Sequence, residues 1–171
     1  MTKGYVIWIN GPFGVGKTTT ARALHQHFKD SLLFDPEQIG FLLRKILPPS
    51  SSIKSIQEDF QDLPLWRKLT KTTIEMLVRD YQRPVIVPMT IVNPGYFNEI
   101  IQELRLSGII VKHFTLMATI PTLRRRLLKR FWMPGNRWAF QQINRCLTAL
   151  SSSLFATHIN TDGQSVSQVV E

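Results

Sequence analysis

A glycine-rich turn near the start of the chain restricts its possible folds more than any other part of the sequence. Residues 11–18 read GPFGVGKT and match the pattern G-x-x-x-x-G-K-[ST] at every fixed position. A short apolar run at residues 5–9 precedes the turn, and residues 18–28 follow it with the spacing of an amphipathic helix. This is the strand–turn–helix context in which the pattern binds phosphate. The alternative is a chance glycine turn before a helix, and the full match in this context disfavours it.

Each fixed residue of the turn has a physical role in holding phosphate. The glycines permit positive φ, so that backbone N–H groups point inward, and the following helix directs its positive end at the same anion. Lys17 offers a mobile cation to the γ-phosphate, and Thr18 offers a hydroxyl to Mg²⁺. We expect ATP or a close relative to be held by Gly11, Pro12, Phe13, Gly14, Val15, Gly16, Lys17, Thr18 and Thr19. Transfer of the γ-phosphoryl group to a small molecule is the expected reaction, and a purely regulatory nucleotide is the alternative.

The rest of the chain alternates between strand and helix patterns. Apolar and β-branched runs occur at residues 5–9, 32–34, 85–87, 109–117 and 158–160. Helical spacing of apolar residues occurs at 18–28, 39–46, 97–104, 120–131 and 140–150, and a further helix follows residue 163. This alternation predicts an α/β fold with a parallel sheet covered by helices on both faces. The length of 171 residues predicts a single domain, residues 1–171.

The charge of the chain points to an anionic partner. Lysine and arginine exceed aspartate and glutamate by 21 − 12 = +9, and residues 104–161 contain no acidic residue. Nucleic acid, an anionic membrane surface or several phosphates on one small ligand would each fit. Nucleic acid is disfavoured because no interleaved aromatic residues accompany the basic ones. Cys146 is the only cysteine, and no stretch is long enough to span a bilayer, so we expect a cytoplasmic protein.

A basic helix late in the chain is a candidate lid over the phosphates. In the helix at residues 120–131, the apolar residues Ile120, Leu123, Leu127 and Phe131 are expected to face the core. Arg126, Lys129 and Arg130 then lie on the other side, with Arg126 and Arg130 four residues apart. We expect a lid near residues 124–138, in which Arg126 and Arg130 act catalytically by neutralising charge on the transferring phosphoryl group. The alternative is a solvated helix face.

The same region also offers a surface for membrane contact. Arg124, Arg125 and Lys129 flank an aromatic and apolar tip at residues 131–133. Basic and apolar side chains in this combination predict weak, salt-sensitive binding to anionic vesicles. Peripheral association with a membrane is therefore part of the expected localisation.

Asp35 is the candidate catalytic carboxylate. It follows the second predicted strand, at the carboxyl edge where parallel sheets bind ligands. It could orient a substrate hydroxyl, accept its proton or hold Mg²⁺ through water; capping of the next helix is the alternative. The strand at 85–87 ends in Pro88, Met89 and Thr90 rather than in an aspartate near the metal. Thr18 and Asp35 are therefore the expected metal-site residues, and Met89, Thr90, Asn93 and Tyr96 are expected on the substrate side of the cleft.

Several motifs resemble those of the bacterial tunicamycin-resistance proteins, a branch of the small P-loop kinase-like proteins. They include Ile7-Trp8-Ile9-Asn10-Gly11, Phe34-Asp35-Pro36-Glu37 and Val87-Pro88-Met89-Thr90-Ile91-Val92. The Pro-Met-Thr strand end among them is more specific than the phosphate loop. The resemblance implies a five-stranded parallel sheet like that of gluconate and shikimate kinases, and ATP as a ligand. It also implies protection against tunicamycin, a lipid-tailed nucleoside antibiotic. By position, it places residues 11–18 on phosphates, Arg126 and Arg130 in a lid, and Asp35 toward the substrate.

Three functions are compatible with these observations. The first is an ATP-dependent phosphotransferase that acts on a hydroxyl of tunicamycin or a similar sugar nucleoside. The second is an ATP-dependent protein that binds and sequesters the drug without modifying it. The third is a kinase for an unrelated small metabolite.

Overall fold

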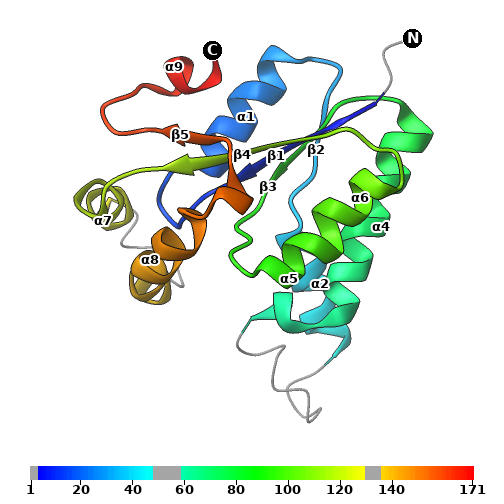
Figure 1. The fold of residues 1–171 in the computed structure, drawn as a ribbon, viewed down its shortest axis with the longest axis horizontal. Coiled ribbons are helices and arrows are strands. Elements are labelled where there is room, and N and C mark those ends of the chain that lie inside the picture. The colour runs from blue at the N-terminus through cyan, green and yellow to red at the C-terminus, as the bar shows by residue number, and fades with distance from the viewer. Residues whose placement is uncertain (1–3, 48–58, 130–135) are drawn as a thin grey trace.

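The apolar runs of the chain form the five strands of one parallel sheet. The computed structural model describes residues 4–47, 59–129 and 136–171. The strands are β1 (Val6–Asn10), β2 (Leu32–Leu33), β3 (Val85–Pro88), β4 (Val111–Met117) and β5 (His158–Asn160). Their order across the sheet is β2-β3-β1-β4-β5, and every pairing is parallel (Figure 1). The predicted fold, a five-stranded parallel sheet flanked by helices, is confirmed.

The central strand, β1, is buried along its whole length. Val6 and Trp8 pack into the core on one face of the sheet, and Ile7 and Ile9 pack into the core on the other. Side chains alternate between the faces of a strand, so a strand that is covered on both faces needs an unbroken apolar run. β1 pairs with both β3 and β4, which brings the carboxyl ends of these three strands to one edge of the sheet.

Helices connect the strands and cover both faces. The longer ones are α1 (Lys17–His27), α2 (Glu37–Ile46), α4 (Pro64–Tyr81), α7 (Ile120–Leu128) and α8 (Asn136–Leu150). The shorter ones are α5 (Pro94–Phe97), α6 (Glu103–Leu106) and α9 (Val166–Val170), with a π-helical segment at Asn98–Gln102 between α5 and α6. Two 3₁₀ turns, η1 (Phe60–Asp62) and η3 (Ser153–Phe155), precede α4 and β5.

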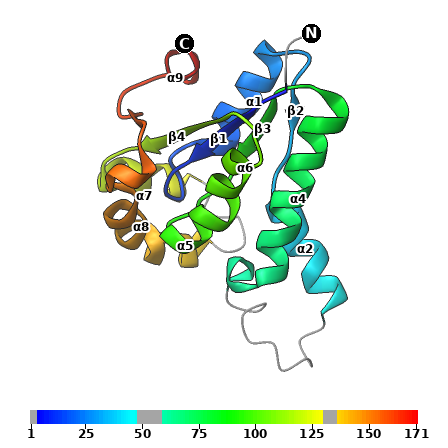
Figure 2. The ribbon, with the colours of Figure 1, turned by 45° about the vertical axis from the view of Figure 1, so that its right-hand side comes forward.

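The two faces of the sheet have separate cores. On one face, Trp66 and Ile74 of α4 pack with Ile100 and Leu104 from the α5–α6 segment. Figure 2 shows α4 and this segment side by side. The other face is covered by α1, α7 and part of α8, and its core includes Leu123. None of the described helices is both long enough and apolar enough to cross a bilayer.

The predicted elements match the observed ones except in three places. α4, the longest described helix, is not among the helices that the apolar spacing indicated. The helix expected at 97–104 belongs to a longer helical stretch that contains the π-helical segment. The helix expected at 120–131 ends at Leu128 in the structure, and residues 130–135 of the expected lid lie outside the described residues. Pro88 ends β3 as predicted, because proline has no N–H to continue the ladder.

Candidate functional site

The glycine turn has the backbone that a phosphate-binding loop requires. It connects the end of β1 to α1, which begins at Lys17 as expected. Gly11, Gly14 and Gly16 adopt φ values of 144°, 81° and 109°. A Cβ atom at Gly14 would lie 2.9 Å from Leu127 Cγ, so a larger residue there would disturb both the loop and α7. Because the loop follows the last residue of β1 and precedes α1, it lies at the carboxyl edge of the sheet, with the amino end of α1 directed at it.

Lys17 lies across the turn that precedes it. Its Nζ donates to the carbonyl oxygens of Gly11 at 3.0 Å and Pro12 at 3.1 Å, and it lies 5.4 Å from the centroid of the Phe13 ring. Thr18 and Thr19 are exposed on the first turn of α1. The structure thus brings together the residues that the sequence analysis proposed for the phosphates.

Asn10, to which the sequence analysis gave no role, ties the loop to the neighbouring strands. Its Oδ1 accepts from the N–H groups of Gly11 at 2.8 Å and Ile91 at 3.0 Å, and its Nδ2 donates to the Ile91 carbonyl at 2.9 Å. Nδ2 also lies 3.3 Å from Nε2 of His113 on β4. The Asn10 side chain is fully buried, so these contacts fix the start of the loop against the segment after β3.

The segment after β3 also contacts the loop through Thr90. The Thr90 hydroxyl donates to the Gly11 carbonyl at 2.7 Å, and the Thr90 carbonyl accepts from Gln61 Nε2 at 2.9 Å. Met89 and Thr90 are buried. Asn93, at the N-cap of α5, accepts from Gly95 N, and Tyr96 donates its hydroxyl to Asp62 at 2.7 Å. Of the four residues expected on the substrate side, Met89 and Thr90 are therefore buried, and Thr90 contacts the loop.

Asp35 caps α2 and also lies in the electrostatic field of Lys17. Its Oδ1 accepts from the N–H of Glu37 at 3.0 Å, which is the capping contact weighed as the alternative. Burial raises the pKa of Asp35, and the charges of Lys17 and Arg22 partly oppose that rise. Burial also raises the pKa of Glu37, and the Asp35 carboxylate adds to it. The contact with the α2 backbone does not exclude a role in the site, because the charge of Lys17 reaches both carboxylates.

Two oxygen donors that suit a magnesium ion lie near Lys17, one on the next residue of the chain and one on a carboxylate that the Lys17 charge affects. The hydroxyl of Thr18 and the carboxylate of Asp35 are hard donors, and Mg²⁺ in such sites takes few protein ligands and completes its shell with phosphate oxygens and water. Among the described residues, no group of three or more histidine, cysteine, aspartate or glutamate side chains could hold a metal ion. The donors that are present fit an ion that is bound together with a nucleotide rather than by a protein cage.

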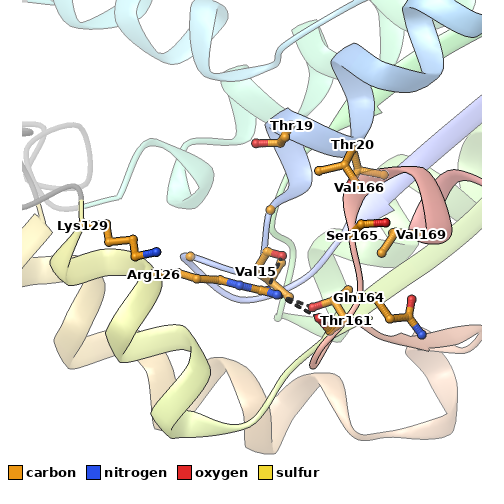
Figure 3. A pocket seen from close by; sticks show the side chains of 12 residues that line it. Val15, Thr19, Thr20, Arg126, Lys129, Thr161, Gln164, Ser165, Val166 and Val169 are labelled. Carbon is orange, nitrogen blue, oxygen red and sulfur yellow. Dashed lines mark hydrogen bonds between the residues drawn. The ribbon is translucent and has the colours of Figure 1, made fainter.

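Arg126 joins α7 to the loop and to the end of β5. Its Nη1 donates to the Val15 carbonyl at 3.0 Å and to Thr161 Oγ1 at 2.9 Å, and its Nη2 donates to the Thr161 carbonyl at 2.8 Å (Figure 3). The sequence analysis placed Arg126 on the side of the helix away from the core, together with Lys129 and Arg130. In the structure Arg126 is half-buried, whereas Lys129 is exposed and Arg130 lies outside the described residues.

A pocket of about 370 Å³ opens beside Arg126. The loop, α7 and the segment after β5 all line it (Figure 3). It combines the Arg126 guanidinium, the Gln164 amide and the Ser165 hydroxyl with the apolar side chains of Val166 and Val169. The wall is therefore mixed, with charged, polar and apolar side chains around the space beside the loop. The segment after β5 was not predicted to take part, because its residues match no phosphate-binding pattern.

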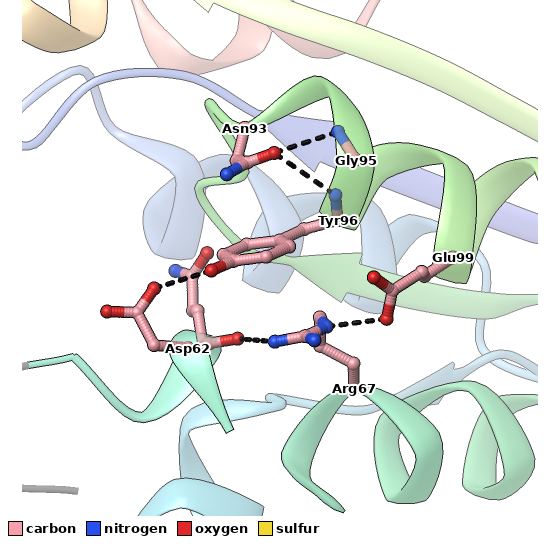
Figure 4. Close-up of polar contacts among 7 residues, drawn as sticks. Asp62, Arg67, Asn93, Gly95, Tyr96 and Glu99 are labelled. Atoms are coloured by element: carbon pink, nitrogen blue, oxygen red, sulfur yellow. Dashed lines mark hydrogen bonds and ion pairs between the residues drawn. The ribbon is translucent and has the colours of Figure 1, made fainter. Parts of the chain in front are cut away.

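A second polar cluster holds η1 beside the loop. Arg67 on α4 lies with its Nε 2.6 Å from Glu99 Oε2, and its Nη1 donates to the Gln61 carbonyl at 2.6 Å (Figure 4). The Arg67 guanidinium also stacks 4.2 Å from the centroid of the Tyr96 ring. Because Gln61 bonds to Thr90, this cluster connects α4 to the phosphate-binding loop.

Comparisons with known proteins agree with this geometry. The protein family described as AAA domain matches residues 6–142. The tunicamycin resistance protein of Deinococcus radiodurans is 32% identical with a TM-score of 0.77, and the match covers 97% of this chain and 91% of that one. No match was found among curated proteins.

Two kinases share the fold at lower identity. A gluconokinase from Sinorhizobium meliloti 1021 is 16% identical with a TM-score of 0.64 and coverage of 99% and 88%. The APS kinase of Mycobacterium tuberculosis, solved with AMPPNP and APS, is 15% identical with a TM-score of 0.63 and coverage of 99% and 95%. At these identities the likeness shows the fold alone. The chain therefore belongs to the family of P-loop, kinase-like proteins that includes the tunicamycin resistance protein of Deinococcus radiodurans.

Proposed function

We propose that this protein is an ATP-dependent phosphotransferase that acts on a hydroxyl of tunicamycin or a similar sugar nucleoside. The observation that carries the proposal is the geometry of the loop, where Lys17 and the amino end of α1 converge at the carboxyl edge of the sheet. The 32% identity with the Deinococcus protein supports tunicamycin as the substrate class.

The nucleotide is held by the loop and by the pocket beside it. The backbone N–H groups of residues 13–16 and the Lys17 ammonium bind the phosphates. Thr18 would hold the magnesium ion, with Asp35 reaching it through a water, so that the Asp35 carboxylate stays available to the acceptor hydroxyl. The ion supplies charge neutralisation to the phosphates when it is bound. The pocket next to Arg126 accommodates the nucleoside, and its guanidinium adds positive charge on that side of the phosphates.

Asp35 acts as the base for the acceptor hydroxyl. Burial raises its pKa, and a more basic carboxylate accepts a proton more readily from an attacking hydroxyl. The new bond forms between the hydroxyl oxygen and the γ-phosphorus while the bond from the γ-phosphorus to the β,γ-bridging oxygen breaks. ADP leaves with that oxygen, and the hydroxyl proton passes to Asp35.

Mass spectrometry of tunicamycin after incubation with the protein, Mg²⁺ and ATP tests this proposal. We expect the mass of one added phosphate, and we expect Lys17→Ala to abolish the gain. Undiminished transfer by Lys17→Ala would refute the assignment of the site. A drug that is neither modified nor bound would redirect the search to other small metabolites.

Sequestration of the drug without chemistry is the second candidate, and one observation favours it. Thr90 stands near the end of β3 where many phosphate-loop proteins carry an aspartate, and its hydroxyl is bonded to the Gly11 carbonyl. The same experiment separates the two functions, because sequestration predicts tight binding of a drug that stays unmodified after long incubation with ATP.

A further inference from the structure

We infer that Thr90 is a positioning residue for Lys17: its hydroxyl keeps the Gly11 carbonyl hydrogen-bonded when Lys17 leaves that carbonyl for phosphate. The inference rests on the proposed nucleotide site. Two donors share the Gly11 oxygen, the Thr90 hydroxyl at 2.7 Å and the Lys17 ammonium at 3.0 Å. A carbonyl oxygen has two lone pairs and can accept both.

Lys17 must give up a carbonyl in order to bridge two phosphates. An ammonium has three N–H donors, and in the structure two of its acceptors are the Gly11 and Pro12 carbonyls. Contacts to both the β- and the γ-phosphate use two donors, which leaves one for the two carbonyls. When Lys17 leaves, a buried carbonyl loses its hydrogen bond unless another donor remains. A buried acceptor without a donor is unfavourable.

The two carbonyls differ in the hydrogen-bond donor that remains on each of them after Lys17 leaves. The other donor recorded on the Pro12 oxygen is the Val15 N–H, at 3.4 Å, which is a long contact. The other donor on the Gly11 oxygen is the Thr90 hydroxyl, at 2.7 Å. Gly11 is therefore the carbonyl from which Lys17 departs at the lower free-energy cost, and Thr90 makes that departure possible.

Thr90 is held independently of Lys17. Its side chain is 6% exposed, and its carbonyl accepts from Gln61 Nε2 at 2.9 Å. The next residue, Ile91, bonds to the Asn10 side chain through both its N–H and its carbonyl. The hydroxyl therefore stays on Gly11 while Lys17 moves.

The test compares ATP with ADP in Thr90→Val, a variant of similar shape that lacks the hydroxyl. Dissociation constants of Mg-ATP and Mg-ADP are measured by isothermal titration calorimetry. We expect ATP to bind about tenfold more weakly in Thr90→Val, as for one stranded acceptor. The affinity for ADP should change by about twofold or less, because without a γ-phosphate Lys17 can stay on Gly11. Thr90→Ser keeps a hydroxyl and should restore the wild-type ratio of the two constants.

Two further variants separate positioning from structural damage. Thr115→Val removes another buried threonine hydroxyl, one that donates to the Phe155 carbonyl at 2.6 Å, and should lower stability without changing the ATP-to-ADP ratio. Thr90→Ala replaces Thr90→Val if the valine variant does not fold. Equal weakening of ATP and ADP, or no weakening of either, would overturn the inference. Failure of the wild-type protein to bind ATP would instead overturn the proposed function.

Discussion

Asn10 is the residue whose side chain does most to join the loop to the sheet. Its amide bonds to Gly11 and Ile91 and lies within hydrogen-bond distance of His113. These contacts use both donors and both acceptor positions of the side chain. Removal of the amide would leave several buried backbone groups without a partner, and each of these is unfavourable.

We therefore expect Asn10→Ala to destabilise the protein by about 2–4 kcal/mol, with the effects of the lost contacts not strictly additive. Urea unfolding at neutral pH measures the change in the free energy of unfolding. Asn144→Ala, at an exposed position of α8, is the control and should stay within about 0.5 kcal/mol of the wild type. Equal stability of the two variants would contradict the assigned role of Asn10.

His113 makes the stability depend on pH. Burial lowers the pKa of His113 from 6.5 to about 4, an effect that the hydrogen bond to the Ala156 carbonyl partly opposes. Arg105 and His158 lower it slightly further. Between these two pH values the unfolded chain binds a proton at this residue and the folded chain does not. The contribution of His113 to the free energy of unfolding therefore falls as the pH drops from 6.5 to about 4.

Between pH 6.5 and about 4, the contribution of His113 to the free energy of unfolding falls by at most about 3 kcal/mol. Three carboxyl groups oppose this fall in stability, because the folded state binds their protons more tightly than the unfolded chain does. Burial is the chief cause of the raised pKa values of Asp35, Glu37 and Asp59. We expect His113→Gln to flatten the pH dependence relative to the wild type. Urea unfolding at pH values from about 7 to 5 measures both slopes. Parallel wild-type and His113→Gln curves would refute the prediction.

At the scale of elements, Arg67 holds η1, α4 and the π-helical segment together. It bonds to the Gln61 carbonyl and to Glu99, and its side chain is 9% exposed whereas that of Glu99 is 52% exposed. The pair is thus only half buried, and we expect Arg67→Ala to lower the free energy of unfolding by about 2 kcal/mol. The pair of Arg79 and Glu75, in which the arginine is exposed, is the control, since Arg79→Ala should lower the free energy of unfolding by less than about 1 kcal/mol.

A kinetic measurement separates this anchoring role from a general loss of stability. Because no residue of η1 lines the pocket beside Arg126, Arg67→Ala should raise the KM for the acceptor more than the Kd for ATP. A rise in the ATP Kd alone would argue against a role for η1 on the acceptor side.

Arg126 connects three elements beside the loop. Arg126 is part of α7, and its guanidinium donates hydrogen bonds to Val15 in the loop and to Thr161 after β5. Arg126→Ala would leave two backbone carbonyls without their charged donor, and we expect about tenfold weaker binding of ATP. Arg125→Ala, one residue earlier and exposed, should keep the wild-type affinity. Calorimetric titration of both variants measures this, and equal affinities would show that Arg126 does not shape the site.

At the scale of the whole molecule, the net charge of +9 predicts interaction with anionic surfaces. Arg124, Arg125 and Lys129 are exposed on and just after α7, while Arg126 is turned inward. We expect weak flotation with phosphatidylglycerol vesicles at low salt and its loss at high salt. Replacement of the three exposed residues by alanine should reduce flotation. Neutral phosphatidylcholine vesicles serve as the control, and no flotation at low salt would contradict the predicted membrane contact.

Local patterns of the sequence were sufficient for the central strands of the sheet and for the phosphate-binding loop, whereas the short strands β2 and β5 give only a weak local signal. Continuous apolar runs identify strands that are buried on both faces, and the loop pattern specifies its own backbone, since Gly11, Gly14 and Gly16 adopt the positive φ that glycine permits. α4 escaped prediction because its buried row of Trp66, Thr70, Ile74 and Val78 includes a polar residue, and neighbouring lysine and threonine residues obscure the apolar spacing.

Contacts between distant segments were decided only by the tertiary structure. The bonds from Asn10 to Ile91 and from Gly11 to Thr90 join residues about 80 positions apart, and no local pattern encodes them. Arg126 lies on the polar side of its helix by sequence, but the loop and the end of β5 contact it there and partly bury its charge. Sequence periodicity determines which face of an element is apolar, whereas the packing of the whole chain decides which polar side chain finds a partner.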